Sequence, residues 1–246
     1  MADSPARRLR ELMLDLSALV WPTSCVACGA ADRDCCRTCR ERLSEPPEVM
    51  SRELDGVTCL ARGSYEGPLR AVLVAFKHDG RVGFSAMLGA ELRAPLLSAV
   101  RLATERTPRA LLAPLIVTMP SRPAGVRRRG YRHLDVLVAA ALRGRRAPAL
   151  RARVLRTTRG RIGQVGLRAA ERERNARRIA IKRSARRLVR GRDIVLVDDI
   201  ITTGASMRAA REALEQAGAQ VAVMVALCVA ERQDASGVPA KSRVKS

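Results

Sequence analysis

Residues Ile194–Ala210 read IVLVDDIITTGASMRAA and carry most of the information about the fold. An apolar run at residues 194–197 ends in two adjacent carboxylates, Asp198 and Asp199. Two neighbouring negative charges repel each other and lose solvation when they are buried, so a purely structural role does not explain them. We therefore interpret the pair as facing a ligand. We expect it to contribute little to folding.

The turn behind the two acids has the composition of a phosphate cradle. Free backbone N–H groups, hydroxyl donors and the positive end of a following helix all favour an anion there. The predicted phosphate-binding residues are Thr202, Thr203, Gly204, Ala205 and Ser206. If the carboxylates face sugar hydroxyls or Mg²⁺, the acid pair and the turn together form a site for a phosphorylated sugar.

Two other nucleotide-binding patterns are missing from the sequence. A P-loop NTPase also places acids after an apolar strand, but the chain has no GxxxxGK[ST] motif and no Gly-Lys pair. A dinucleotide-binding fold would need GxGxxG, which is also missing. The remaining alternative is a chance turn without a ligand.

Strand and helix patterns alternate along the rest of the chain. Apolar runs predict strands at residues 56–65, 109–120, 193–199 and 219–230. Periodic apolar patterns predict helices at residues 67–77, 85–103, 133–143 and 204–218. This order predicts an α/β fold with a mainly parallel sheet flanked by helices on both faces. Asp198 and Asp199 would follow a strand at its carboxyl end, where open parallel sheets bind ligands.

Five of the seven cysteines lie close together near the start of the chain. Two CxxC pairs are separated by seven residues, a spacing that can present four thiolates to one tetrahedral zinc ion. The predicted ligands are Cys25, Cys28, Cys36 and Cys39, with Cys35 left over. Two disulfides or a redox dithiol are the alternatives. Cys59 and Cys228 stand alone in apolar runs and are expected to be small buried hydrophobes.

Positive charge is concentrated in one segment of this 246-residue chain, whose net charge is +22. Residues 121–192 contain 23 Arg and one Lys against three acids. A field of this sign favours polyanions such as phosphorylated small molecules, nucleic acid or an anionic membrane. A solvated basic surface without a specific ligand is the alternative. Aromatic residues make up only 2%, so any contact with DNA should be mainly to phosphates.

The segments outside the main α/β pattern are short. Residues 9–20 predict an amphipathic helix, and residues 43–54, LSEPPEVMSREL, read as a linker. We expect an N-terminal unit at 1–45, a main domain at 55–232 and a disordered tail at 233–246. No apolar stretch reaches membrane-span length, and no secretory cleavage site follows the first apolar stripe. A cytoplasmic location is therefore expected.

The stretch VLVDDIITTGAS at residues 195–206 resembles the phosphoribosyl-diphosphate (PRPP) binding motif of type I phosphoribosyltransferases. The resemblance implies a type I phosphoribosyltransferase-like fold in which Asp198 and Asp199 take the ribose hydroxyls and residues 202–206 take the 5′-phosphate. It also implies Mg²⁺ bound together with PRPP.

Within that superfamily the chain is similar to the ComF family of competence-associated proteins. The paired CxxC knuckles, YEGPLRAVLVAFKHDG at 65–80 and the segment from TMP at 118–120 to RRRGY at 127–131 carry this resemblance. Further matches at the family's spacing are Arg156, Gln164, Leu167, Arg172 and Asn175. Arg132 and His133 depart from the Asn-Gln that the family usually has there.

Several single residues have two interpretations. Lys77 either reaches a phosphate oxygen or only lies at a helix end. A candidate pyrophosphate loop comprises Arg127, Arg128, Arg129 and Gly130. Its arginines either bind pyrophosphate or are merely solvated. His78 and His133 are expected to be exposed and to lack a partner for base catalysis.

Two functions follow from the sequence. The first is a phosphoribosyltransferase with an acceptor that the sequence does not identify. The second, implied by the ComF resemblance, is a PRPP-binding accessory protein in DNA uptake that contacts single-stranded DNA or a DNA-uptake helicase. PRPP binding without turnover would favour the second.

Overall fold

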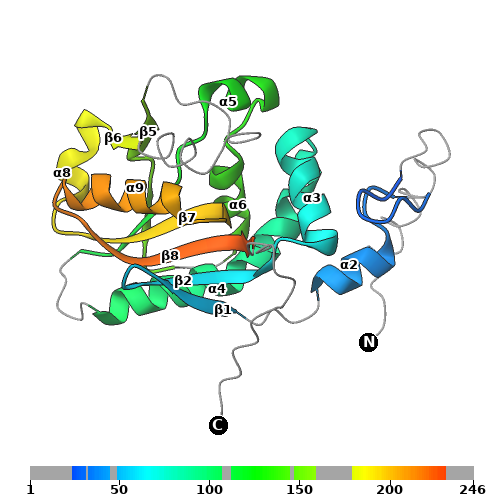
Figure 1. The fold of residues 1–246 in the computed structure, drawn as a ribbon, viewed down its shortest axis with the longest axis horizontal. Coiled ribbons are helices and arrows are strands. Elements are labelled where there is room, and N and C mark those ends of the chain that lie inside the picture. The colour runs from blue at the N-terminus through cyan, green and yellow to red at the C-terminus, as the bar shows by residue number, and fades with distance from the viewer. Residues whose placement is uncertain are drawn as a thin grey trace, which may run out of the picture.

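A six-stranded sheet forms the centre of the molecule (Figure 1). The computed structural model describes residues 24–31, 33–44, 49–106, 112–144, 147–158 and 179–230. The strand order is β1-β2-β8-β7-β3-β4. In that order the strands span Met50–Leu54, Val57–Ser64, Gln220–Val229, Asp193–Ile201, Leu115–Thr118 and Leu150–Ala152. Every neighbouring pair is parallel except β1 and β2, so the predicted α/β fold with a mainly parallel sheet is confirmed.

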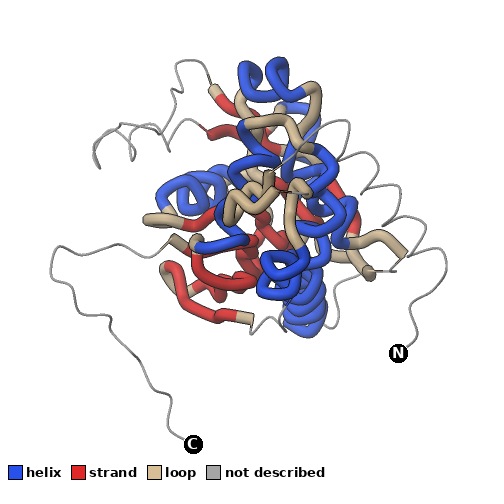
Figure 2. The backbone as a smooth tube through the Cα atoms, turned by 90° about the vertical axis from the view of Figure 1, so that its right-hand side faces the viewer, coloured by secondary structure: helices blue, strands red, loops and turns tan. Residues whose placement is uncertain are grey.

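Helices cover both faces of this sheet. One face carries α3 (Gly67–His78), α4 (Ser85–Arg106) and α6 (His133–Ala141), and the other carries α9 (Ala205–Glu215) and α8 (Arg186–Val189). The view of Figure 2 shows the strands lying between helices. Shorter elements complete the described part of the chain: α2 (Arg37–Ser44), η1 (Val82–Phe84), α5 (Pro123–Arg129), η2 (Arg183–Ala185) and the antiparallel pair β5 (Leu155–Thr157) and β6 (Ile179–Ile181).

Strand β7 shows why the sheet needs helices on both sides. Successive side chains of a strand point to opposite faces. Val195 and Val197 pack with α3, α4 and α6, while Ile194 and Leu196 pack with α9. All four are fully buried, which requires two apolar layers and accounts for the uninterrupted apolar run in the sequence.

A glycine sets the distance between α4 and α6. A Cβ atom at Gly89 would lie 2.5 Å from Cβ of Ala140 and 2.9 Å from the carbonyl carbon of the same residue. The two helices therefore approach too closely for any side chain at that position. This contact holds α6, and with it His133 at its first turn, against the sheet.

The cysteine-rich segment and α2 pack onto the main domain. Cys25, Cys35, Cys39 and Leu43 belong to the same buried apolar cluster as α3 and α4. Arg62 on β2 strengthens the junction, because it donates to the carbonyl of Leu43 at 2.7 Å and pairs with buried Glu91 of α4 at 2.6 Å.

A second ion pair joins this segment to the far end of α3. Nη1 of Arg81 lies 2.8 Å from Oδ1 of Asp34. Both side chains are partly exposed, so this pair orients the segment more than it stabilises it. Helix α2 also packs directly against α3, the helix that carries Lys77.

The structure departs from the sequence-based elements in two places. Residues 50–54, interpreted as part of a linker, form edge strand β1, because they pair in register with the apolar strand β2. Strand β7 continues through both acids to Ile201, because its last residues stay paired with β8.

Some predictions lie outside the described residues. These are the helix at 9–20, the tail at 233–246, and the family matches Gln164, Leu167, Arg172 and Asn175. Within the described ranges, no helix has the length and apolar character needed to cross a membrane.

Candidate functional site

The two acids lie where β7 meets the end of β3. Thr118, the last residue of β3, pairs with Val197, and the N–H of Met119 donates to the carbonyl of Val197 at 2.8 Å. The chain leaves β3 at this point, while β7 runs on for four more residues. Asp198 and Asp199 are therefore placed at the carboxyl edge of the parallel sheet, where such sheets bind ligands.

Asp199 is buried and has two close partners. Its Oδ2 lies 2.6 Å from Nζ of Lys77, on α3, and 2.7 Å from Nε2 of His133, on α6. Burial alone would raise the pKa of Asp199, but Lys77 and His133 outweigh burial and hold the pKa well below its usual range. Asp199 is therefore ionised and internally paired.

Asp198 has a different environment. Because side chains alternate along a strand, it points away from Lys77 and His133, and its register partner Ala226 belongs to the apolar layer under α9. Its Oδ1 accepts a hydrogen bond from the N–H of Asp199 at 2.8 Å. Burial and the adjacent charge of Asp199 raise the pKa of Asp198. Of the two acids, Asp198 thus has more to gain from a cation or a hydroxyl donor.

The turn after β7 has the geometry of a helix N-terminus. Residues 202–204 follow the strand, and α9 begins at Ala205. Gly204 is the N-cap with φ +75°, a left-handed conformation that a residue with a Cβ rarely adopts. A Cβ there would lie 2.7 Å from Cδ2 of Leu54 on β1. The glycine is thus favoured by the backbone conformation and by packing against Leu54.

The same turn is held by two side chains. Oγ1 of Thr203 accepts from the N–H of Ala205 at 3.4 Å, and Nη2 of Arg208 donates to the carbonyl of Thr203 at 2.8 Å. Arg208 is exposed and lies one turn into α9. It brings a positive charge next to the predicted phosphate residues, and the sequence analysis missed it. The signal was its position four residues after Gly204, on the same side of the helix.

Residues 127–129 form the end of helix α5, not a loop. Their helix ends at Gly130, which has φ 78°. Arg127 and Arg128 are exposed. Arg129 turns inward instead: its Nη1 donates to the carbonyl of Lys77 at 3.0 Å, and its Nη2 lies 3.3 Å from Nδ1 of His133.

Tyr131 fixes the neighbouring end of α3. Its hydroxyl donates to the carbonyl of Phe76 at 2.6 Å, and the two rings pack with centroids 5.4 Å apart. Together with Arg129, it satisfies two of the last carbonyls of α3, which have no partner within the helix. The C-terminal turn of α3, and so Lys77, is positioned by residues more than fifty positions further along the chain.

The expectation that His133 is exposed was wrong. Its exposed fraction is 8%, and it has a buried carboxylate partner, whereas His78 is exposed as predicted. Sequence pattern could not find the contact between His133 and Asp199, because 66 positions separate the two residues. His133 is thus, with Lys77, one of the two residues that hold Asp199.

The four predicted cysteine ligands lie together. The Sγ atoms of Cys25, Cys28, Cys36 and Cys39 lie within 4.8 Å of one another, and all seven cysteines of the chain are free. Tetrahedral zinc with Zn–S bonds of about 2.3 Å needs sulfur separations of about 3.8 Å, so the four atoms fit a metal ion. Cys35 is outside the cluster, and burial raises the pKa of its thiol to about 11. Cys59 and Cys228 are buried, as predicted.

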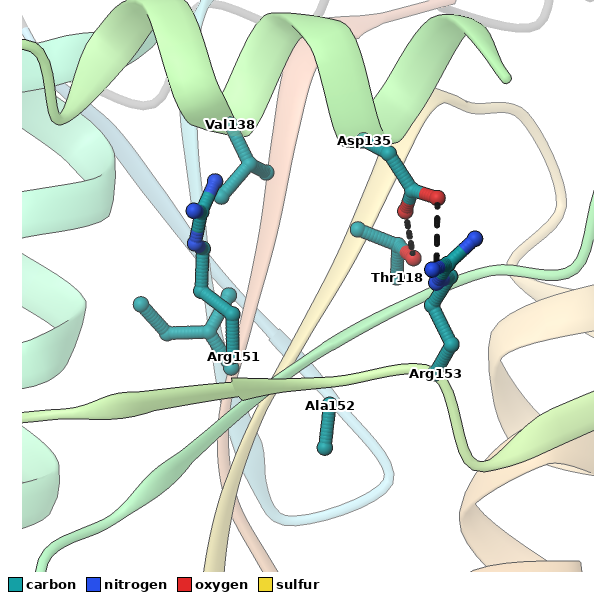
Figure 3. Close-up of a pocket in the computed structure, with 7 residues that line it drawn as sticks. Thr118, Asp135, Val138, Arg151, Ala152 and Arg153 are labelled. Atoms are coloured by element: carbon teal, nitrogen blue, oxygen red, sulfur yellow. Dashed lines mark hydrogen bonds and ion pairs between the residues drawn. The ribbon is translucent and has the colours of Figure 1, made fainter. Parts of the chain in front are cut away.

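A pocket of about 450 Å³ lies beside the site, where α6 leaves part of β3 and β4 uncovered (Figure 3). Its polar wall is a chain of contacts: Oγ1 of Thr118 donates to Asp135 at 2.8 Å, and Nε of Arg153 lies 3.8 Å from the same carboxylate. Arg151 projects into the pocket next to Val138 in Figure 3. These groups add positive charge to the edge of the sheet.

A comparison with models of protein families gives a match to the second part of the chain. Residues 132–245 match the family model described as the phosphoribosyl transferase domain. No curated protein matches the chain. The matched residues include β7, the turn at 202–206 and α9.

Solved structures of low identity also resemble the chain. An allosteric regulatory enzyme of purine biosynthesis is 18% identical with a TM-score of 0.30, and the match covers 78% of this chain and 30% of that one. An adenine phosphoribosyltransferase is 18% identical with a TM-score of 0.35, covering 78% and 98%. A protein of Thermus thermophilus is 23% identical with a TM-score of 0.27, covering 62% and 86%. Residues 132–245 of this chain are thus similar to a phosphoribosyl transferase domain.

Proposed function

We propose that this chain is a type I phosphoribosyltransferase of the ComF kind, which binds PRPP and transfers its phosphoribosyl group to an acceptor. The observation that carries the proposal is one arrangement at the edge of the sheet. A half-buried and a buried acid on β7, Asp198 and Asp199, are followed within five residues by a left-handed glycine and the N-terminus of α9. A sugar with a 5′-phosphate fits this order of groups, because hydroxyls donate to carboxylates and phosphates accept from helix N–H groups.

The basic residues around the acid pair could bind the pyrophosphate group of PRPP. Lys77 and Arg129 lie on the same side of β7 as Asp199, and Arg127 and Arg128 are exposed nearby on α5. These cations would neutralise pyrophosphate as it leaves. When the bond between C1′ and the pyrophosphate oxygen breaks, the electron pair leaves with pyrophosphate and positive charge develops on the ribose. Carboxylates next to the ribose would stabilise that charge.

Two metal ions are part of the proposal. Mg²⁺ would bind together with PRPP, and Asp198 fits it because its carboxylate has no ion-pair partner within the described ranges. Bound Mg²⁺ would offset the charge of the pyrophosphate oxygens. Zinc would be held by Cys25, Cys28, Cys36 and Cys39, with no coordination position left for a substrate. Its role would be to hold residues 24–44 together.

The proposal is tested by isothermal titration of PRPP in the presence of Mg²⁺, together with PRPP consumption over a panel of purine and pyrimidine bases. Turnover with any base establishes the transferase. Binding without turnover favours the accessory role in DNA uptake. No heat of binding from PRPP with Mg²⁺ would contradict the proposed site.

Asp198→Asn should weaken PRPP binding about tenfold to a hundredfold. A hydrogen bond to a charged group contributes about 1.5–3 kcal/mol, and 1.4 kcal/mol corresponds to a tenfold change in Kd. The variant without ligand should be as stable as the wild type or more stable, because the raised pKa means that ionised Asp198 lowers stability as the pH rises above about 4. Thermal melts at several pH values and titration with PRPP check both effects. Equal PRPP affinity with a much lower melting temperature would make Asp198 structural.

A second candidate function, contact with single-stranded DNA, is favoured by the distribution of arginines. Helices α5 and α8 and the strands β5 and β6 lie along the upper side of the view in Figure 1. Exposed arginines on and beside these elements are Arg122, Arg127, Arg128, Arg153, Arg156, Arg183, Arg186, Arg187 and Arg190. A polyanion that bridges several of these would gain mostly from counterion release.

Binding of single-stranded DNA should therefore weaken steeply with salt. Each phosphate contact adds roughly −0.7 to the log–log slope on single strands. Reversing Arg127 and Arg128 to Glu should make the slope about 1.4 less steep, measured by fluorescence anisotropy at several salt concentrations. Arg101→Glu, at an exposed position on α4, is the matched control and should leave the slope unchanged. A salt-independent affinity in the wild type would contradict the electrostatic interpretation.

A further inference from the structure

His133 lies between two side chains of the candidate site, and its ring nitrogens face different groups. Nε2 lies 2.7 Å from Oδ2 of Asp199. Nδ1 lies 3.3 Å from Nη2 of Arg129 and 3.5 Å from Oγ of Ser121. The ring is buried, so these neighbours, and not bulk water, decide where its proton lies.

The partners select one protonation pattern. An arginine side chain only donates hydrogen bonds, so Nδ1 must accept from Arg129. A neutral imidazole with Nδ1 as acceptor carries its proton on Nε2, which then donates to Asp199. A proton on Nδ1 would face a guanidinium donor instead. Arg129, which only donates, and ionised Asp199, which only accepts, therefore select the same tautomer of His133.

Arg129 itself is incompletely satisfied. Its Nη1 donates to the carbonyl of Lys77, but its Nε is buried and meets no acceptor within the described part of the chain. Burial also lowers the pKa of the guanidinium group. A buried donor without an acceptor is unfavourable, because it loses its hydrogen bonds to water and gains none in return. A multivalent anion beside Arg129 would supply the missing acceptor and draw the guanidinium group away from His133.

We propose that His133 is a positioning residue that links an anion bound by Arg129 to the carboxylate of Asp199. The inference rests on the proposed PRPP site and adds to it a coupling between the pyrophosphate side and the ribose side. When Arg129 turns to pyrophosphate, Nδ1 of His133 loses its charged donor and keeps only the hydroxyl of Ser121 at 3.5 Å, so the N–H bond to Asp199 weakens. Oδ2 of Asp199 then accepts more readily from a ribose hydroxyl. Pyrophosphate therefore strengthens the binding of ribose 5-phosphate through His133.

The coupling is measured by titrating ribose 5-phosphate with and without saturating Mg²⁺-pyrophosphate. In the wild type, pyrophosphate should lower the Kd of ribose 5-phosphate about fivefold or more, the lower end of typical allosteric couplings. His133→Gln should retain the coupling, because an amide can both donate to Asp199 and accept from Arg129. His133→Leu should lose it. His78→Gln, at the exposed histidine, is the matched control: its amide can still accept from Arg128, which lies 3.4 Å from Nδ1 of His78, so it should behave as the wild type.

Nitrogen-15 NMR tests the hydrogen-bond order without any ligand. The chain has two histidines, so the His78→Gln variant assigns both. His133 should carry its proton on Nε2 in the free protein, and Arg129→Met should shift the Nδ1 resonance, because Nδ1 loses a charged donor, while ionised Asp199 keeps the proton on Nε2. A proton fixed on Nδ1, or an equal coupling factor in the wild type and His133→Leu, would overturn the inference. If neither ligand binds the wild type, the proposed function fails, and the NMR result alone upholds or overturns the link from Arg129 to Asp199.

Discussion

Replacing Lys77 by methionine should lower the free energy of unfolding by about 3–5 kcal/mol, the usual cost of removing one partner of a buried ion pair. Lys77 and Asp199 lie 2.6 Å apart with side-chain exposures of 22% and 7%. Methionine keeps most of the apolar length of lysine and removes only the charge. Asp199 would then remain as a buried carboxylate with His133 as its neighbour. Urea denaturation of both proteins at pH 7 measures the difference.

A double variant tests whether the loss of stability comes from the pair of Lys77 and Asp199. Asp199→Asn in the Lys77→Met background should restore much of the lost stability, because no unpaired charge then stays buried. Lys182→Met is the matched control: Nζ of Lys182 donates to the carbonyl of Arg153 in an exposed position, so its loss should change stability by about 0.5 kcal/mol or less. A stable Lys77→Met variant would mean that Asp199 is not ionised in the fold.

This result would also revise the expectation that the acid pair contributes little to folding. From the sequence alone the two acids have the same expected role, but in the structure their environments differ. Asp199 is paired with Lys77 and His133, so Asp199→Asn alone should lower the melting temperature. Asp198 lacks such partners within the described ranges, so the original expectation is kept for it.

Cys36→Ser should abolish metal binding and unfold residues 24–44. Structural zinc in comparable four-ligand sites contributes an apparent free energy of about 10–16 kcal/mol at neutral pH, and three thiolates retain only part of it. The zinc content, measured by elemental analysis of purified protein, should fall from about one per chain to near zero. Solubility should fall as well, because Cys25, Cys39 and Leu43 would leave the apolar cluster that they share with α3 and expose its surface.

Cys35→Ser is the matched control for the zinc prediction. Cys35 is adjacent in sequence and buried, but its Sγ lies outside the four-sulfur cluster. Its thiol lies 3.9 Å from the carbonyl of Cys36, where a serine hydroxyl can donate instead, so the cost should be roughly 1 kcal/mol. The variant should keep its metal and its solubility. Equal metal loss in the two variants would show that the ligand set is wrong.

Local sequence pattern was sufficient to predict most helices and strands, the four-cysteine cluster and the acid pair with the turn that follows it. The apolar runs of β7 and β8 must be buried on both faces, and only a helix-covered parallel sheet does this for such runs. The CxxC spacing brings four thiols together because each pair spans a single turn. The acids Asp198 and Asp199 and the turn at 202–206 are contiguous in the chain, so their juxtaposition needs no tertiary information.

Edge strand β1 illustrates where local pattern failed. Its five residues, MSREL, are largely polar and exposed, and they follow a Pro-rich segment, so composition favours a linker. They form a strand because β2 offers an unpaired edge. Leu54 of this strand then fills the space that a side chain at Gly204 would need. The partner decides the structure here, and it follows after only two residues, Asp55 and Gly56, whose positive φ angles make a hairpin turn. An Asp-Gly pair is a hairpin signal, and the sequence analysis missed it.

The sequence by itself determined most strands and helices, the acid pair, the turn at 202–206 and the four-cysteine cluster, because each depends on residues that are near one another in the chain. Only the tertiary structure decided which acid is neutralised and which stays available to a ligand. That choice depends on Lys77 from α3 and His133 from α6, which meet at Asp199 on β7. Arg129 from α5 contacts both of these residues. Burial makes the choice energetically strong, since a carboxylate excluded from water must take whatever cation and donor the neighbouring helices place within reach.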